Sequence, residues 1–249
     1  MDDERYKYLD PKEFYANHLD SWSEYWDNGL NLYKNVENII AQSVFLPSKS
    51  IVLPIAATYL LIPTKWSLKC GILFSFGDEG SGKSTIAKLA TKIHGVPYVF
   101  SPSDTFASIR NALDNLRWID PVTKEFEKEG CILCWDNIHT ETLERDLKIY
   151  QMLLFGYDRA TDKISIASLN GSNMDFFVYC PKIISSINPI HLTPQFGELV
   201  RRIILIPHKK WEKFTADERR EYEGIDINID RLDPEVVDWT GIEQNFLLF

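Results

Sequence analysis

The stretch Gly77-Asp78-Glu79-Gly80-Ser81-Gly82-Lys83-Ser84 decides the fold, because it fits the pattern G-x-x-x-x-G-K-[ST] and stands between two readable elements. The apolar run 71–76 before it is typical of a buried strand. Apolar residues after it recur at helical spacing until Gly95 and Pro97 end the pattern: Ile86, Leu89, Ala90 and Ile93. Because backbone N–H groups and a helix N-terminus converge there, the sequence predicts a phosphate-binding P-loop.

Within this loop the residue types assign roles to individual positions. Lys83 is expected to reach the β- and γ-phosphates of a nucleotide, and the Ser84 hydroxyl to face Mg²⁺. Glycine at positions 80 and 82 lets the backbone turn close to the ligand without a Cβ in the way. The residues predicted to contact the nucleotide are Asp78, Glu79, Gly80, Ser81, Gly82, Lys83, Ser84 and Thr85.

Composition excludes several classes of protein. In the 249 residues, 45% are hydrophobic and 13% aromatic, which is enough for a packed core. The net charge of -9 disfavours a protein that coats duplex DNA, so any DNA contact is expected from a local patch. The longest apolar stretch, 51–62, is about half a membrane span, and the first residues lack the pattern of a signal peptide. The sequence therefore predicts a soluble cytoplasmic protein without a membrane contact.

A C-x-x-C pair, Cys131 and Cys134, raises the question of a zinc or redox site. Both lie in an apolar run that is typical of a buried strand, where residues three apart point to opposite faces. We therefore expect buried, reduced thiols.

Strand and helix patterns alternate along the chain, which predicts an α/β fold with a parallel sheet. We expect an N-terminal helical extension over 1–48, a P-loop ATPase core over 49–210, and an acidic C-terminal segment over 211–249. Helices are predicted over about 30–45, 50–61, 103–118 and 140–155, and the last strand over 203–206. Asn170-Gly171 predicts a hairpin turn, and Thr215 with Glu218 a capping box.

A second motif follows the P-loop by about fifty residues. The apolar run 132–135 ends in Asp136, as in a Walker B element, and its carboxylate is expected to hold Mg²⁺ opposite Ser84. The next residue is Asn137, where many ATPases have a glutamate that activates water. An amide orients water but cannot take its proton, so hydrolysis is predicted to be slow unless Glu141 or His139 replaces the base.

Two later features complete the candidate site. The strand 182–187 ends in Asn188, and Arg201 and Arg202 open the last strand. A guanidinium at that position is a candidate arginine finger, Arg202 more than Arg201. A turn-forming asparagine and a solvated charge pair are the alternative interpretations.

The order of these parts over about 50–210 resembles the superfamily-three helicase core, the AAA+ module of phage and plasmid primase-helicases. The resemblance implies that the strand 182–187 lies beside the Walker B strand and that Asn188 acts as sensor 1, positioning water at the γ-phosphate. It also implies a homo-oligomeric ring whose hairpin points a basic residue at single-stranded DNA. Here that hairpin falls within 159–179, with Arg159 and Lys163 as the basic candidates, while the tip 169–173 carries no lysine.

The sequence therefore predicts an AAA+ ATPase that uses ATP and Mg²⁺ in a ring and acts on DNA during replication of a phage or plasmid element. An AAA+ switch or loader without unwinding activity is the first alternative, which Asn137 and the acidic charge favour. A P-loop kinase of small molecules is the second, with Arg201 and Arg202 in its lid.

Overall fold

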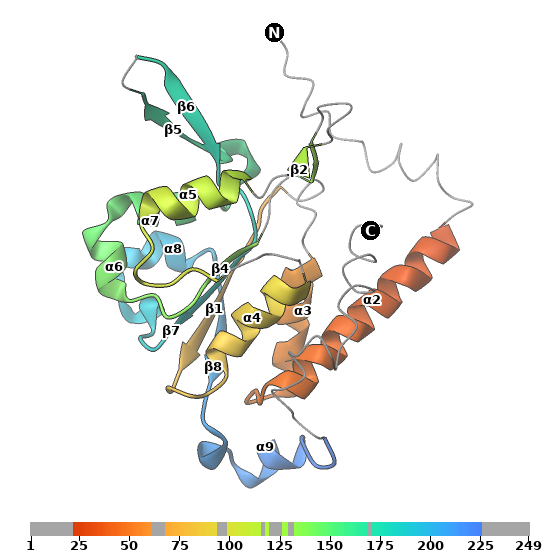
Figure 1. Cartoon of the computed structure of the whole chain (residues 1–249). Helices are drawn as coiled ribbons and strands as arrows, with labels where there is room; N and C mark the ends of the chain where they lie inside the picture. The colour runs from red at the N-terminus through yellow and green to blue at the C-terminus, as the bar shows by residue number, and fades with distance from the viewer. Residues whose placement is uncertain are drawn as a thin grey trace.

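The centre of the computed structural model is a parallel sheet of four strands in the order β4-β7-β1-β8 (Figure 1). The strands are β1 (Ile72–Gly77), β4 (Leu133–Trp135), β7 (Lys182–Ser186) and β8 (Ile203–His208). The structure describes residues 22–60, 68–93, 99–115, 118–119, 126–128, 132–168 and 171–225. The predicted class, an α/β P-loop fold with a parallel sheet and a helical N-terminal extension, is confirmed, and β7 lies beside β4 as the AAA+ resemblance implied.

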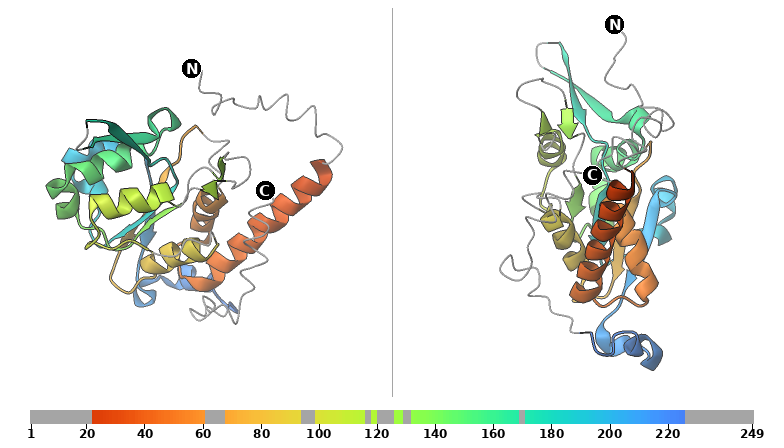
Figure 2. Two further views of the ribbon diagram at one scale, coloured as in Figure 1. Left: turned by 45° about the horizontal axis from the view of Figure 1, so that its top comes forward. Right: turned by 90° about the vertical axis from the view of Figure 1, so that its right-hand side faces the viewer.

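Helices cover both faces of the sheet. Successive side chains of a strand point to opposite faces, and the apolar side chains on each face are buried by helices. Leu73 packs on one side, and Ile72 and Phe74 pack on the other. The first face is covered by α2 (Trp22–Ser43), α3 (Val52–Leu60) and α4 (Lys83–Ile93). The second is covered by α5 (Phe106–Asn115), α6 (Thr140–Arg145), α7 (Leu147–Phe155) and α8 (Gly197–Val200). Figure 2 shows these two layers from further directions.

The described part of the N-terminal extension, from Trp22 onward, contributes to this core. Helix α2 is described from Trp22 and passes through Gly29, so it is longer than the predicted helix over 30–45. A glycine inside a helix costs only about 1 kcal/mol, which the burial of Val36 and Ile40 against α3 and α4 offsets. The aromatic segment before residue 22 lies outside the described residues.

The predicted hairpin about Gly171 is confirmed. Strand β5 (Lys163–Ala167) pairs antiparallel with β6 (Asn173–Phe177), and Gly171 has a φ of +83° in the turn. Helix α5 contacts the end of the hairpin that is far from the turn. Phe177 N donates to Asp114 Oδ1 at 3.1 Å, and the Arg110 guanidinium lies 4.0 Å from the Phe176 ring centroid. The hairpin projects from the end of the molecule opposite to α9 (Ala216–Arg220; Figure 1).

The segment 140–155 is not the one helix that the apolar pattern predicts. It contains α6 and α7, which meet at Asp146. The Asp146 carboxylate accepts a hydrogen bond from Lys148 N at 3.0 Å and so caps α7. An N-capping aspartate competes with a continuous helix, which the apolar periodicity alone does not reveal.

Other boundaries also differ from prediction. Helix α5 begins after Thr105, whose Oγ1 accepts from Ser108 N at 3.2 Å, so it starts later than the predicted helix over 103–118. Between α5 and β4, the short strands β2 (Trp118–Ile119) and β3 (Phe126–Lys128) pair antiparallel. Before α5, Phe100 forms one parallel bridge with Trp135 of β4.

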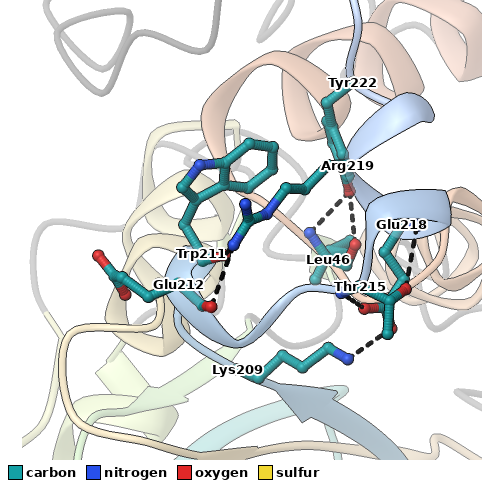
Figure 3. A network of polar contacts seen from close by, with 8 residues as sticks. All are labelled: Leu46, Lys209, Trp211, Glu212, Thr215, Glu218, Arg219 and Tyr222. Atoms are coloured by element: carbon teal, nitrogen blue, oxygen red, sulfur yellow. Dashed lines mark hydrogen bonds and ion pairs between the residues drawn. The ribbon is translucent and has the colours of Figure 1, made fainter.

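After β8 the chain forms a segment, 209–225, that packs against the connection between α2 and α3 (Figure 3). The Tyr222 hydroxyl donates to Leu46 O and accepts from Leu46 N, both at 2.7 Å. The Phe45 and Trp211 rings lie 4.4 Å apart between centroids. The capping box predicted at Thr215 and Glu218 is present and begins α9. No helix in the described part of the chain is long and apolar enough to cross a membrane.

Candidate functional site

The P-loop lies at the carboxyl edge of the sheet, between β1 and the first turn of α4, which begins at Lys83. Asp136 directly follows β4, and Asn188 comes two residues after β7. Because the carboxyl ends of parallel strands meet at one edge, the topology gathers these three motifs, which are far apart in sequence.

One carboxylate oxygen, that of Asp136 after β4, joins the P-loop to β4 and β7. Ser84 Oγ donates to Asp136 Oδ1 at 2.8 Å, across a sequence separation of 52 residues. Ser185 Oγ, from β7, donates to the same oxygen at 2.5 Å. The structure therefore brings Ser84 and Asp136 together, with a third residue that the sequence did not single out.

Asn137 has a structural reason to be an asparagine. Its φ is +55°, in the left-handed region that asparagine tolerates better than most residues. Its backbone N–H donates to Ser185 Oγ at 2.7 Å, which holds the unusual conformation in place. A glutamate at this position would occupy a less favourable backbone conformation.

Lys83 is buried beneath the loop. Its Nζ donates to the carbonyl oxygens of Gly77 at 3.0 Å and Asp78 at 2.5 Å. Burial lowers the pKa of Lys83, while the nearby carboxylates of Asp136, Asp78 and Glu79 act in the opposite direction. The carboxylates favour the charged ammonium, and Lys83 stands in the first turn of α4, where a helix N-terminus favours an anion.

Two P-loop glycines are required by close packing. A Cβ on Gly77, where φ is +140°, would lie 1.9 Å from His208 O on the neighbouring strand β8. A Cβ on Gly82, where φ is +88°, would lie 2.5 Å from Val44 Cγ2, just after α2. The N-terminal extension and the last strand therefore both help to fix the loop, which the motif alone does not indicate.

His208, the last residue of β8, contacts the P-loop. It is 4% exposed, and its Nδ1 lies 3.2 Å from Ser81 O. Burial lowers the pKa of His208 to about 4, although the contact with Ser81 acts in the opposite direction. The ring is therefore neutral at pH 7, with Nδ1–H donating to the carbonyl, and Nε2 has no partner among the described residues.

On its outer side the loop contacts the segment 209–225. Lys213 Nζ pairs with Asp78 Oδ1 at 2.7 Å, and this hydrogen bond lowers the pKa of Asp78. Lys210 Cε lies 4.0 Å from the position of a Cβ on Gly80. Lys213 is 61% exposed, so its ion pair adds little to stability.

The remaining P-loop residues divide by exposure. Glu79 and Gly80 are exposed, whereas Ser81 and Thr85 are buried. Ser81 Oγ donates to Asp78 O at 2.6 Å, and Thr85 N donates to Gly82 O at 3.1 Å. The side that faces solvent is therefore the acidic turn of the loop.

The two alternative bases lie near the site in sequence but are not joined to it. His139 caps the short helix α6 without a side-chain bond, and Glu141 is exposed in its first turn. Among the hydrogen bonds of the described residues, neither contacts Asp136 or Asn137.

Arg201 and Arg202 lie at the amino edge of the sheet, where the parallel strands begin. Ile203 pairs with Ile72 at the start of β1, whereas the P-loop follows the end of β1, about 17 Å away at about 3.3 Å per residue. Arg201 is exposed. Arg202 Nη1 donates to Glu198 O at 2.5 Å, and its guanidinium lies 5.4 Å from the Tyr157 ring centroid.

The basic candidates of the hairpin are also at that edge. Arg159 is 8% exposed and lies beneath the hairpin, and Lys163 is half-buried at the start of β5. On β6, the large apolar side chain of Met174 is 51% exposed. Neither Arg159 nor Lys163 is therefore an exposed residue of the hairpin.

The three cysteines in the described part of the chain are Cys70, Cys134 and Cys180, and all three are buried. Cys134 is buried in the apolar cluster beneath α4, and burial raises its thiol pKa well above its usual range. Cys70, Cys134 and Cys180 are free thiols, as expected for Cys134, and Cys131 lies outside the described residues. Within the described ranges, no group of three or more His, Cys, Asp or Glu side chains is placed to hold a metal ion.

No protein-family model matches the chain. No curated protein matches it either. Among solved structures, the apo A form of the NrS-1 C-terminal region (305–718) is similar at 14% identity and a TM-score of 0.39, over 86% of this chain and 47% of that one. The structure titled SCCmec type IV Cch, an active helicase, is similar at 18% identity and a TM-score of 0.38, over 84% of this chain and 38% of that one. The chain spans less than half the length of either, and likenesses this distant carry no argument about its function.

Sequence reasoning missed two residues of the site, Ser185 and His208. A signal for Ser185 was present, because Ser185-Ser186 is a polar pair inside an otherwise apolar strand. For His208 the only signal was a histidine at the end of the last strand, and its contact with Ser81 depends on the parallel pairing of β8 with β1.

Proposed function

We propose that the chain is an ATP-binding P-loop ATPase of the AAA+ type, which assembles as a ring and acts on DNA in replication of a phage or plasmid element. The contact of Ser84 Oγ with Asp136 Oδ1 carries the nucleotide part of this proposal. It brings the last P-loop residue and the acid of the Walker B strand together at a helix N-terminus, beside the Lys83 ammonium.

The donor set fits a magnesium ion. A carboxylate and a hydroxyl at one point are hard oxygen ligands of the kind that Mg²⁺ takes together with nucleotide phosphates. Ser84 and Asp136 would hold the ion, and it would neutralise charge on the β- and γ-phosphates. Lys83 binds the phosphates, and the loop backbone orients them.

Water at the γ-phosphate would be oriented by Asn137 and Asn188, both at the carboxyl edge after neighbouring strands. Neither amide removes a proton, so we expect slow turnover. Arg201 and Arg202 lie at the opposite edge from their own P-loop, so a role for either as a finger requires the nucleotide of a neighbouring subunit.

A switch or loader without unwinding activity is the alternative that specific observations favour. Asn137 occupies the position of the usual glutamate, and its left-handed backbone favours the amide. Arg159 is buried, and the net charge is -9. These features are compatible with ATP-dependent assembly and do not require a grip on DNA.

The test combines nucleotide binding, assembly and turnover. We expect micromolar or tighter binding of a fluorescent ATP analogue with Mg²⁺, and ring-sized particles in mass photometry only when ATP and Mg²⁺ are present. Turnover stimulated by single-stranded DNA supports the motor, and assembly without stimulation supports the switch. A monomer that transfers phosphate to a nucleoside or sugar would replace both with the kinase, and absence of nucleotide binding would end the proposal.

A further inference from the structure

Ser185 is the residue at which the two halves of the candidate site meet. It is 1% exposed, belongs to β7, and contacts both Asp136 and Asn137. We propose that Ser185 is a positioning residue, which sets the orientation of the Asp136 carboxylate and holds Asn137 in its left-handed conformation. This inference rests on the proposed nucleotide site and adds a residue to it.

The chemistry of a hydroxyl makes the two contacts depend on each other. A serine hydroxyl has one proton to donate and lone pairs to accept with. An ionised carboxylate only accepts, and a backbone N–H only donates. Ser185 Oγ must therefore give its proton to Asp136 Oδ1, at 2.5 Å, and accept from Asn137 N, at 2.7 Å. An alanine here removes both bonds at once.

Strand β7 also binds Ile138, the residue after Asn137, through two hydrogen bonds. Ile138 N donates to Ser185 O at 2.8 Å, and Ser186 Oγ donates to Ile138 O at 2.7 Å. The turn after β4 is thus bound to β7 on both sides of the Asn137 side chain. Of the contacts that β7 makes with Asp136 and Asn137, those of the Ser185 hydroxyl are the ones that a side-chain substitution can remove.

Ser185 also gives Asp136 a partner that does not depend on the P-loop. Asp136 Oδ1 accepts from both Ser84 and Ser185. If the Ser84 hydroxyl turns toward a bound cation, the bond from Ser185 still holds the carboxylate in the same place. Residues that orient a metal ligand in this way typically contribute about 10- to 100-fold to metal affinity.

The neighbouring strand offers a matched control. Ser75 pairs with Ser185 in the register of β1 and β7, and it is fully buried. Its hydroxyl has no partner among the described residues. Ser75→Ala and Ser185→Ala therefore remove the same atom at the same level of the sheet, but only the second removes a contact with the site.

The experiment measures the affinity of a fluorescent ATP analogue in EDTA and at increasing Mg²⁺, for the wild type and the variants. We expect Ser185→Ala to need about tenfold more Mg²⁺ for the same gain in affinity. Its affinity in EDTA should stay within about twofold of the wild type, because the P-loop is unchanged. Ser75→Ala should match the wild type in both conditions, and Ser185→Thr, which keeps the hydroxyl, should restore the Mg²⁺ response.

An unchanged Mg²⁺ response in Ser185→Ala, or an equal loss in Ser75→Ala, would overturn the inference while leaving nucleotide binding in place. A wild type that binds no nucleotide would instead overturn the proposed function, and the role of Ser185 with it. Thermal unfolding of each variant without nucleotide shows whether it is folded. If Ser185→Ala is not, Ser185→Cys, a weaker hydrogen-bond partner of similar volume, replaces it in the same comparison.

Discussion

The two edges of the sheet each bury a lysine, and the two lysines have opposite surroundings. Lys83, at the carboxyl edge, donates to the carbonyls of Gly77 and Asp78. Lys182, at the amino edge, is 0% exposed and donates to the carbonyls of Gly156 and Cys180, the latter at 2.7 Å. Both ammonium groups are therefore bound by backbone oxygens at the end of a strand.

The difference lies in what surrounds each pair of carbonyls. Lys83 lies at a helix N-terminus beneath a loop with exposed residues, and the nearby carboxylates favour its charged form, so it can exchange its carbonyl partners for an anion. Lys182 is fully buried, and a Cβ on Gly156 would lie 2.9 Å from its Nζ. A buried lysine therefore indicates a binding site only when its surroundings can change, and Lys182 instead joins the base of the hairpin to β7.

The largest expected effect tests whether the amino edge is purely structural. If Arg202 acts in a neighbouring subunit, Arg202→Ala should lower ATP turnover by about 10³-fold and leave nucleotide affinity nearly unchanged. Mixing it with inactive Lys83→Ala protein should restore part of the activity, because one kind of interface then has an intact loop and an intact finger.

Arg201→Ala is the matched control for this experiment, since Arg201 is exposed whereas Arg202 is bound to Glu198. If Arg201→Ala is complemented in mixtures and Arg202→Ala is not, the finger is Arg201. If neither mixture exceeds the sum of its parts, the amino edge does not take part in catalysis.

The second prediction concerns the buried imidazole of His208, which contacts the P-loop. The pKa of His208 is lowered from 6.5 to about 4, so between these values the unfolded state binds the proton more strongly. The stability from keeping this ring neutral is present above about pH 6.5 and is lost as the pH falls toward 4. At about 1.36 kcal/mol per pH unit, the loss is about 3 kcal/mol.

Urea unfolding at pH 7 and pH 4.5 measures this loss. His208→Gln keeps an N–H donor for Ser81 O without titrating, so it should flatten the pH dependence, and His139→Gln should not. An equal pH dependence in the wild type and His208→Gln would show that the ring is not a buried neutral group.

The third prediction separates the two lysines directly. Lys83→Met should weaken nucleotide binding by about 2 kcal/mol, near 30-fold, because a charge-assisted hydrogen bond to phosphate is lost. Lys182→Met should leave the nucleotide affinity unchanged and lower the free energy of unfolding by about 1–3 kcal/mol, because two buried carbonyls lose their donor. Nucleotide titration and urea unfolding of both variants check this, and a loss of affinity in Lys182→Met would join the two edges functionally.

The smallest expected effect is a gain. A general base contributes about 10²–10⁴-fold, and the left-handed conformation at Asn137 costs a glutamate about 1–2 kcal/mol. We expect Asn137→Glu to raise single-turnover ATP hydrolysis by about tenfold, with Asn137→Gly as a control that relieves the backbone without adding a base. A fast wild type that slows on Asn137→Glu would assign Asn137 a role that requires its amide.

The sequence by itself determined the features that depend on a few neighbouring residues. The P-loop motif between a strand and a helix, the acid at the end of 132–135, the turn at Gly171 and the capping box at Thr215 are local patterns, and the structure has them. It missed the break at Asp146, where one capping carboxylate outweighs an apolar periodicity that continues through it.

Only the tertiary structure decided which residues from distant strands meet. Parallel pairing is non-local: the family resemblance implied that β7 lies beside β4, but no local pattern says that β1 pairs with β8, or that β8 brings His208 to Ser81. The strand order brings Ser185 to Asp136, and the strand direction puts Arg202 at the opposite edge from the P-loop. Periodicity shows which face of a strand is buried, but the register between strands sets what each buried polar group contacts.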